Sequence, residues 1–83
     1  MGKKKKFNVP VLVTISKDSY VQKLGFLTEE DLSELGIKEG KVAVFLPHSF
    51  NFSGNLFIVD KVNVELIDAK PADVMKFIVS GGI

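Results

Sequence analysis

The sequence predicts a small α+β domain: a curled, mostly antiparallel sheet of about four strands, tending toward a barrel, with a short middle helix and a C-terminal helix. Three observations lead to this class. Within residues 9–16 the β-branched residues Val11, Val13 and Ile15 recur at every second position, as on one face of a strand, residues 71–80 carry apolar side chains at helical spacing, and short turn segments separate the elements. The 83 residues suffice for one small domain. We therefore expect a basic tail at 1–6 and a single soluble domain at 7–83.

The first part of this domain predicts a β-hairpin. A strand at 9–16 would place Val11, Val13 and Ile15 on one face. Residues 17–19 suit a turn, and a second strand is expected at 20–27. Gly25 within that strand indicates either a bulge or a close approach of two backbones.

The middle of the chain predicts a short helix and a third strand. Thr28 has the character of an N-cap, and the acidic residues after it suit the first turn of a helix at 29–35. Leu32 and Leu35 would then face the same way, and Gly36 would end the helix. The third strand is expected at 41–46.

The last third predicts a long fourth strand at 55–67, bent at residues 60–61. Residues 56–59 are apolar at every position, which suits a strand covered on both faces. Beyond the bend, Val62, Val64 and Leu66 alternate with polar residues and predict one buried face. A sheet this small leaves open edges, so pairing with a second copy or with another subunit is expected.

A C-terminal helix is predicted at 71–80. Pro71 suits its first position, and Asp73 in the first turn suits the helix dipole. Gly81 and Gly82 would end it. The face expected to be buried carries Val74, Phe77 and Ile78, with Met75 at its margin.

Several stretches, taken together, resemble a known family. In order and spacing they are similar to the uncharacterised membrane proteins whose plant members are called Continuous Vascular Ring-like (COV-like) and which also occur in bacteria. The resemblance covers most of the chain after Phe7, although the loop at 47–54 departs from the family's Thr-, Pro- and Asn-rich loop and residues 29–41 have no clear counterpart. The stretches are 10–13, 24–28, 44–47 and 54–59, then Val64, Asp68, Asp73, Lys76, Ile78 and 80–82.

This resemblance implies two transmembrane helices followed by a soluble domain. The longest apolar runs here, 42–46 and 56–59, are far shorter than the ~20 residues that a helix needs to cross a bilayer. We therefore expect the chain to be the soluble domain of a longer protein. That protein would reach the cell membrane through helices absent from this chain, with the domain on the cytoplasmic side.

A cluster of basic residues, Lys3, Lys4, Lys5 and Lys6, precedes the domain. The chain has a net charge of +1, so its remainder has −3, since +1 less the four lysines is −3. The cluster is either a solvated tail or a juxtamembrane group that contacts anionic lipid. A nucleic-acid arm is the weaker interpretation, because the folded part shows no basic stripe.

The loop after the third strand is the candidate site for a partner. Its contact residues would be Pro47, His48, Phe50, Asn51 and Phe52, with the two phenylalanines either folded onto the core or forming an exposed apolar knob. His48 beside Ser49 is a poor nucleophile–base pair, because sequence neighbours seldom reach the required geometry. We assign no catalytic, cofactor-binding or metal-binding residues. The sequence also has no cysteine, which excludes disulfides and thiolate metal sites.

The sequence thus favours a non-enzymatic interaction or regulatory domain of an integral membrane protein. The alternative is a DNA-binding regulator of the swapped-hairpin type, which the stretch 32–46 resembles. Nucleic acid is the less favoured partner, because such a reader uses Arg and Lys on its recognition strands, whereas the charges near this stretch are mostly acidic.

Overall fold

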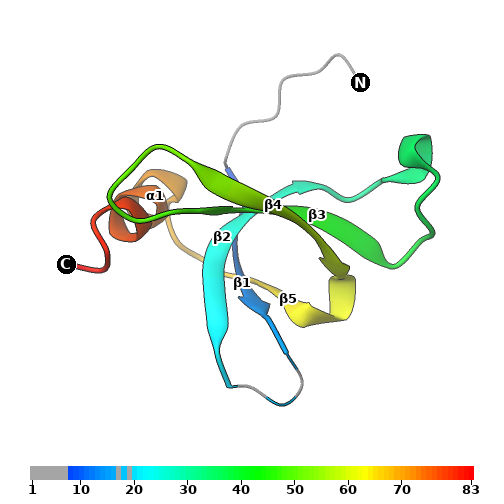
Figure 1. Ribbon diagram of the computed structural model, residues 1–83, viewed down its shortest axis with the longest axis horizontal. Coiled ribbons are helices and arrows are strands. Elements are labelled where there is room, and N and C mark those ends of the chain that lie inside the picture. Colours follow the sequence, from blue (N-terminus) through cyan, green and yellow to red (C-terminus); the bar gives the residue numbers. More distant parts are fainter. Residues whose placement is uncertain (1–7, 17, 19) are drawn as a thin grey trace.

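The computed structural model describes residues 8–16, 18 and 20–83, and shows one antiparallel sheet with a helix at the end of the chain (Figure 1). The strands are β1 (Pro10–Thr14), β2 (Gln22–Glu29), β3 (Lys41–Pro47), β4 (Gly54–Asp60) and β5 (Val64–Leu66). The helical elements are the 3-10 turns η1 (Ser33–Leu35) and η2 (Lys61–Asn63) and the helix α1 (Pro71–Val79). The predicted α+β class is confirmed.

The described part of the sheet has five strands in the order β4-β3-β2-β1-β5, so the prediction of about four was wrong. The expected long strand at 55–67 is divided by η2. Val62 and Leu66 are 90% and 66% exposed, so the predicted buried face is wrong for both, and only Val64 is partly buried. This turn lets the chain pass from one edge of the sheet, β4, to the other edge, β5. The sheet is therefore strongly curled, but it does not close into a barrel.

One face of the sheet encloses the larger core. Its centre consists of Val11, Val13, Val42, Val44 and Leu46, all buried. These residues alternate along β1 and β3 because successive side chains of a strand point to opposite faces. The predicted face of the first strand is confirmed for Val11 and Val13, whereas Ile15 lies beyond the end of β1 and is half-exposed.

The other face carries α1. Phe26 of β2 is fully buried and packs with Val74 and Ile78 of the helix. Met75 is only partly buried, as its marginal position predicted, whereas Phe77 is 55% exposed and not on the buried face. The helix begins at Pro71 as predicted and ends within a residue of the expected position.

The middle helix is much shorter than predicted. Residues up to Glu29 belong to β2, and Thr28 donates its hydroxyl to the carbonyl of Ala43 on β3, 3.3 Å away, instead of capping a helix. Cross-strand pairing thus outweighs the local capping signal. Leu32 is buried while Leu35 is exposed, so they do not share a face. Gly36 does end the turn, in the left-handed conformation.

The predicted hairpin between the first two strands is confirmed, since β1 pairs with β2 in an antiparallel register. Two residues of its turn, Lys17 and Ser19, lie outside the described residues. The bulge that Gly25 suggested occurs further along, between Leu27 and Glu29. Gly25 itself marks a close approach of backbones, which positions the candidate site.

Candidate functional site

The sheet forks where β2 leaves β3. β2 pairs with β3 from Phe26 onward, while Gln22–Gly25 pair only with β1 and the end of β3 pairs only with β4. Gly25 sits at the fork: a Cβ there would lie 2.5 Å from the carbonyl oxygen of Phe45 and 2.5 Å from a methyl group of Leu46. Only glycine allows so close a crossing.

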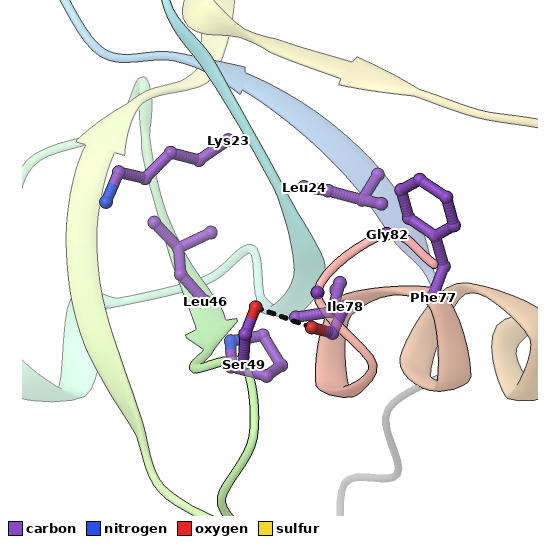
Figure 2. A pocket seen from close by; sticks show the side chains of 9 residues that line it. Lys23, Leu24, Leu46, Ser49, Phe77, Ile78 and Gly82 are labelled. Atoms are coloured by element: carbon purple, nitrogen blue, oxygen red, sulfur yellow. Dashed lines mark hydrogen bonds between the residues drawn. The ribbon is translucent and has the colours of Figure 1, made fainter.

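The C-terminal end of α1 lies against this fork and leaves a shallow, open hollow of about 400 Å³ (Figure 2). In Figure 2, Lys23 and Leu46 extend from facing strands on one side, while Phe77 and Leu24 lie together on the other. The walls are mainly apolar, and Lys23 supplies the one charged side chain of the lining. The lining residues are Lys23, Leu24, Leu46, Pro47, Ser49, Phe77, Ile78, Gly81 and Gly82.

The loop at 48–53 is fastened to the end of α1. The hydroxyl of Ser49 donates to the carbonyl of Ile78 at 2.7 Å, drawn as the dashed line in Figure 2, and the backbone N–H of Phe50 donates to the carbonyl of Val79 at 2.7 Å. Carbonyls at a helix C-terminus have no partner within the helix. The loop therefore caps the helix, and the helix in turn fixes the shape of the loop.

The helix also ends on its own glycines, as predicted. The N–H of Gly82 donates to the carbonyl of Phe77 at 2.8 Å, and that of Gly81 to the carbonyl of Ile78 at 3.0 Å. This pair of bonds is the Schellman motif, in which the first glycine takes a left-handed conformation; Gly81 has φ +75°. The ring of Phe50 lies directly over Gly81, because a Cβ there would meet a ring carbon at 2.6 Å.

A second set of bonds holds the loop from within. Asn51 accepts bonds from the N–H and the hydroxyl of Ser53, at 2.9 and 2.8 Å. Nδ1 of His48 lies 2.8 Å from the Ser53 hydroxyl, and Nε2 lies 3.1 Å from the amide nitrogen of Asn55. Since Ser53 gives its only hydroxyl proton to Asn51, Nδ1 carries the imidazole proton and Nε2 accepts from Asn55.

This arrangement brings His48 to Ser53, whereas the sequence suggested Ser49 as its neighbour. A nucleophilic serine donates its proton to the imidazole base. Here the proton of Ser53 points to Asn51, so the network shapes the loop and offers no activated hydroxyl. Among the described residues, no three His, Cys, Asp or Glu side chains gather to hold a metal ion.

The fixed loop presents its aromatic side chains outward. Phe52 is 103% exposed, and Phe50 is 74% exposed although one side of its ring rests on Gly81. Folding onto the core, which the sequence allowed, is therefore wrong for both. The knob that the sequence offered as the other possibility exists. Pro47 ends β3, and His48 and Asn51 take part in the hydrogen bonds of the loop. Lys3, Lys4, Lys5 and Lys6 lie outside the described residues.

A second exposed apolar surface lies along β4 and was not predicted as a site. Leu56, Phe57 and Ile58 are 64%, 42% and 40% exposed. The sequence pattern of 56–59 predicted a strand covered on both faces, and this is wrong for the single chain, because β4 is an edge of the sheet. The apolar run at 56–59 is itself the signal that could have identified this surface, because a strand that is apolar on both faces needs a cover on both.

The described charges near this edge are largely paired with one another. Lys41 lies 2.5 Å from Asp60, and Lys61 lies 3.8 Å from Glu30, with all four side chains at the surface.

Asp31, next to η1, accepts from the N–H of Ser33 at 3.0 Å. Hydrogen bonds from the side chain of Ser33 and then from its backbone hold the pKa of Asp31 below its ordinary value of 3.8.

Comparison with known proteins gives a family for the chain. Residues 1–54 match the family model described as "Protein of unknown function (DUF502)", which is more than half of the 83 residues. The chain belongs to the DUF502 family. The match covers β1, β2, β3 and the loop at 48–53, and it ends where β4 begins.

No curated protein and no solved structure matches this DUF502 chain. Among the described residues, no helix combines the length and the apolar composition that crossing a membrane requires.

Proposed function

We propose that this DUF502 chain is an interaction domain of an integral membrane protein, that it lies on the cytoplasmic side of the cell membrane, and that it acts by contact and not by catalysis. The observation that carries the contact role is the loop at 48–53. It is held at both the helix and the strand side, yet it leaves Phe52 fully exposed.

A fixed loop is a good contact element because little conformational entropy is lost when a partner binds. Aromatic side chains contribute large contact areas and are enriched at protein interfaces. The loop surface of Pro47, His48, Phe50, Asn51 and Phe52 is therefore the proposed contact with a protein partner. The apolar hollow at the fork adjoins it through Pro47.

The membrane part of the proposal rests on the resemblance to the COV-like family, whose members combine transmembrane helices with a soluble domain. The lysines at 3–6 fit that setting, because a basic cluster next to the bilayer is attracted to anionic lipid by about 1 kcal/mol per lysine. The DNA-binding alternative gains little from the described residues: Lys41 and Lys61, near the third strand, are each close to a carboxylate.

Vesicle co-sedimentation tests the membrane part. We expect the chain to bind anionic vesicles and not neutral ones, and to be released by high salt, since the Debye length shortens to about 3 Å at 1 M. Replacing Lys3 to Lys6 by glutamine should weaken binding on the order of several hundredfold. Phe52→Ser should leave vesicle binding unchanged. Absence of binding to anionic vesicles at low salt would refute membrane contact through the lysines.

Site-specific photo-crosslinking tests the loop in the full-length membrane protein. A photoreactive residue at Phe52 should form a crosslink to a protein, whereas the same residue at Leu66 should not. Leu66 is a suitable control because it is 66% exposed and apolar but lies on β5, at the opposite edge of the sheet from β4. Equal crosslinking at both positions, or crosslinking of Phe52 to lipid alone, would contradict a protein contact at the loop.

A further inference from the structure

The edge strand β4 combines features that edge strands of single chains usually avoid. Soluble proteins protect such edges with charges, proline or very short strands. The other edge, β5, follows this rule, since it has three residues and includes Glu65. β4 has seven residues, and neither a charged residue nor a proline occurs from Gly54 to Val59.

The backbone of β4 is oriented for pairing. His48 N donates to Ser53 O just before the strand, and Lys61 N donates to Gly40 O just after it, both at 2.8 Å. Hydrogen-bonded and non-hydrogen-bonded pairs alternate along an antiparallel ladder. Since the register with β3 is regular, the odd-numbered residues bond to β3. Leu56 and Ile58 therefore turn their N–H and C=O groups toward the open edge.

The side chains of β4 are exposed on both faces of the sheet. Phe57 pairs with Val44 and so shares the face of the larger core, while Leu56 and Ile58 pair with Phe45 and Ala43 on the opposite face. A cover that lay on one face alone would leave the other exposed. A strand added to the edge would place side chains beside those of β4 on both faces at once.

We infer that the cover is β4 of a second copy, paired antiparallel about a two-fold axis at Phe57. In this register the outward N–H and C=O groups of Leu56 in each copy meet those of Ile58 in the other copy. The two Leu56–Ile58 pairs are therefore both hydrogen-bonded pairs. Phe57 meets its own counterpart as a non-hydrogen-bonded pair. No like charges oppose each other, because residues 54–59 carry none.

The size of this contact indicates a weak dimer. An aromatic side chain offers about 150–250 Å², and Leu and Ile are smaller, so the exposed parts of Leu56, Phe57 and Ile58 amount to roughly 200–300 Å² per copy. Two copies together bury less than the ~1,200 Å² of a standard stable interface. We expect a dissociation constant on the order of tens of micromolar.

The inference deepens the proposed interaction function, on which it rests, by naming one partner.

Analytical ultracentrifugation of the unaltered chain over a wide concentration range tests the dimer. Reversible association to a dimer is expected. Leu56→Lys should raise the dissociation constant at least about tenfold, since the pair with Ile58 occurs twice in the dimer. Leu66→Lys is the matched control, because Leu66 is similarly exposed at the opposite edge. A chain that stays monomeric at all concentrations, or equal weakening by both variants, would overturn the inference.

Cysteine crosslinking tests the register, and the chain has no cysteine of its own. A cysteine at Phe57 would lie about 4.5 Å in Cα distance from its counterpart, within the range for a disulfide. A cysteine at Asn55, on the same face, would be separated from its counterpart by four residues, roughly 13 Å. Oxidised dimer is therefore expected from Phe57→Cys and not from Asn55→Cys, and the reverse result would overturn the register.

The two proposals can fail separately. A monomeric chain that still binds anionic vesicles overturns the β4 dimer and leaves the membrane role. A dimer that binds no vesicles keeps the β4 pairing and removes the membrane role. Phe52→Ser is a control variant in both the ultracentrifugation and the vesicle assay, because it changes the loop and leaves β4 intact.

Discussion

Replacing Gly81 by alanine should destabilise the domain more than replacing Gly36 by alanine, because Gly81 supports an aromatic ring and Gly36 does not. Both glycines have nearly the same left-handed φ, +75° and +74°. A Cβ at Gly36 meets nothing within 4 Å, whereas a Cβ at Gly81 would lie 2.6 Å from the ring of Phe50. The pair therefore separates the backbone cost from the packing cost.

The expected magnitudes follow from this geometry. A left-handed conformation costs an alanine about 1–2 kcal/mol, of which roughly 0.4–1 kcal/mol is offset because alanine lowers the entropy of the unfolded chain. Gly36→Ala should thus cost about 1 kcal/mol. Phe50 is 74% exposed, so the remaining 26% of its surface is buried. Displacing its ring loses about 50 Å² of contact, or roughly 1 kcal/mol more.

Thermal and urea unfolding of the two variants measure these terms. A loss of 1 kcal/mol lowers the melting temperature of a domain this size by about 4–8 °C, so Gly81→Ala should show about twice the shift of Gly36→Ala. In a Phe50→Ala background the extra cost should disappear, giving a coupling energy of about 1 kcal/mol. Equal shifts for both glycine variants would refute the docking of Phe50 on the helix end.

Two further predictions follow from the fork and from η1. Gly25→Ala should destabilise the domain by about 1–3 kcal/mol in urea unfolding, because the added Cβ would collide with the backbone oxygen of Phe45; a variant as stable as the parent would show that β2 and β3 do not cross so closely. The lowered pKa of Asp31 means that its carboxylate stabilises the fold above the unfolded value near 3.8, and that this contribution is lost as the pH falls through the lower folded value. Asp31→Asn should therefore melt below the parent at neutral pH, and the difference should shrink below about pH 3.8; a difference independent of pH would contradict the bond from Ser33.

The sequence predicted those parts of the fold that depend on one element at a time. Alternation identified Val11 and Val13 as core, and helical spacing identified Val74 and Ile78. Gly81 and Gly82 correctly marked the helix end. These signals succeed because the periodicity of a buried face and the conformation of a C-cap are local properties of the chain.

The errors occur where one element depends on a distant one. Thr28 resembles an N-cap in sequence, but its hydroxyl is used by Ala43 across the sheet. The alternation through Val62 predicted a continuous strand, but the chain must turn there to reach β1 from the far edge. The partner of His48 is five residues away, and the sequence offered only the adjacent serine. None of these contacts follows from the spacing of residues.

The most informative of these errors concerns β4. The sequence pattern of 56–59 is that of a strand with cover on both faces, and the structure places that strand at an open edge. The pattern and the placement agree once a further strand is added to the edge, since only then are both faces covered. The family match ends at Gly54, so DUF502 membership does not bear on β4. Its role has to be judged from its own exposure, register and lack of protecting charges, and all three point to a strand that is paired when the protein works.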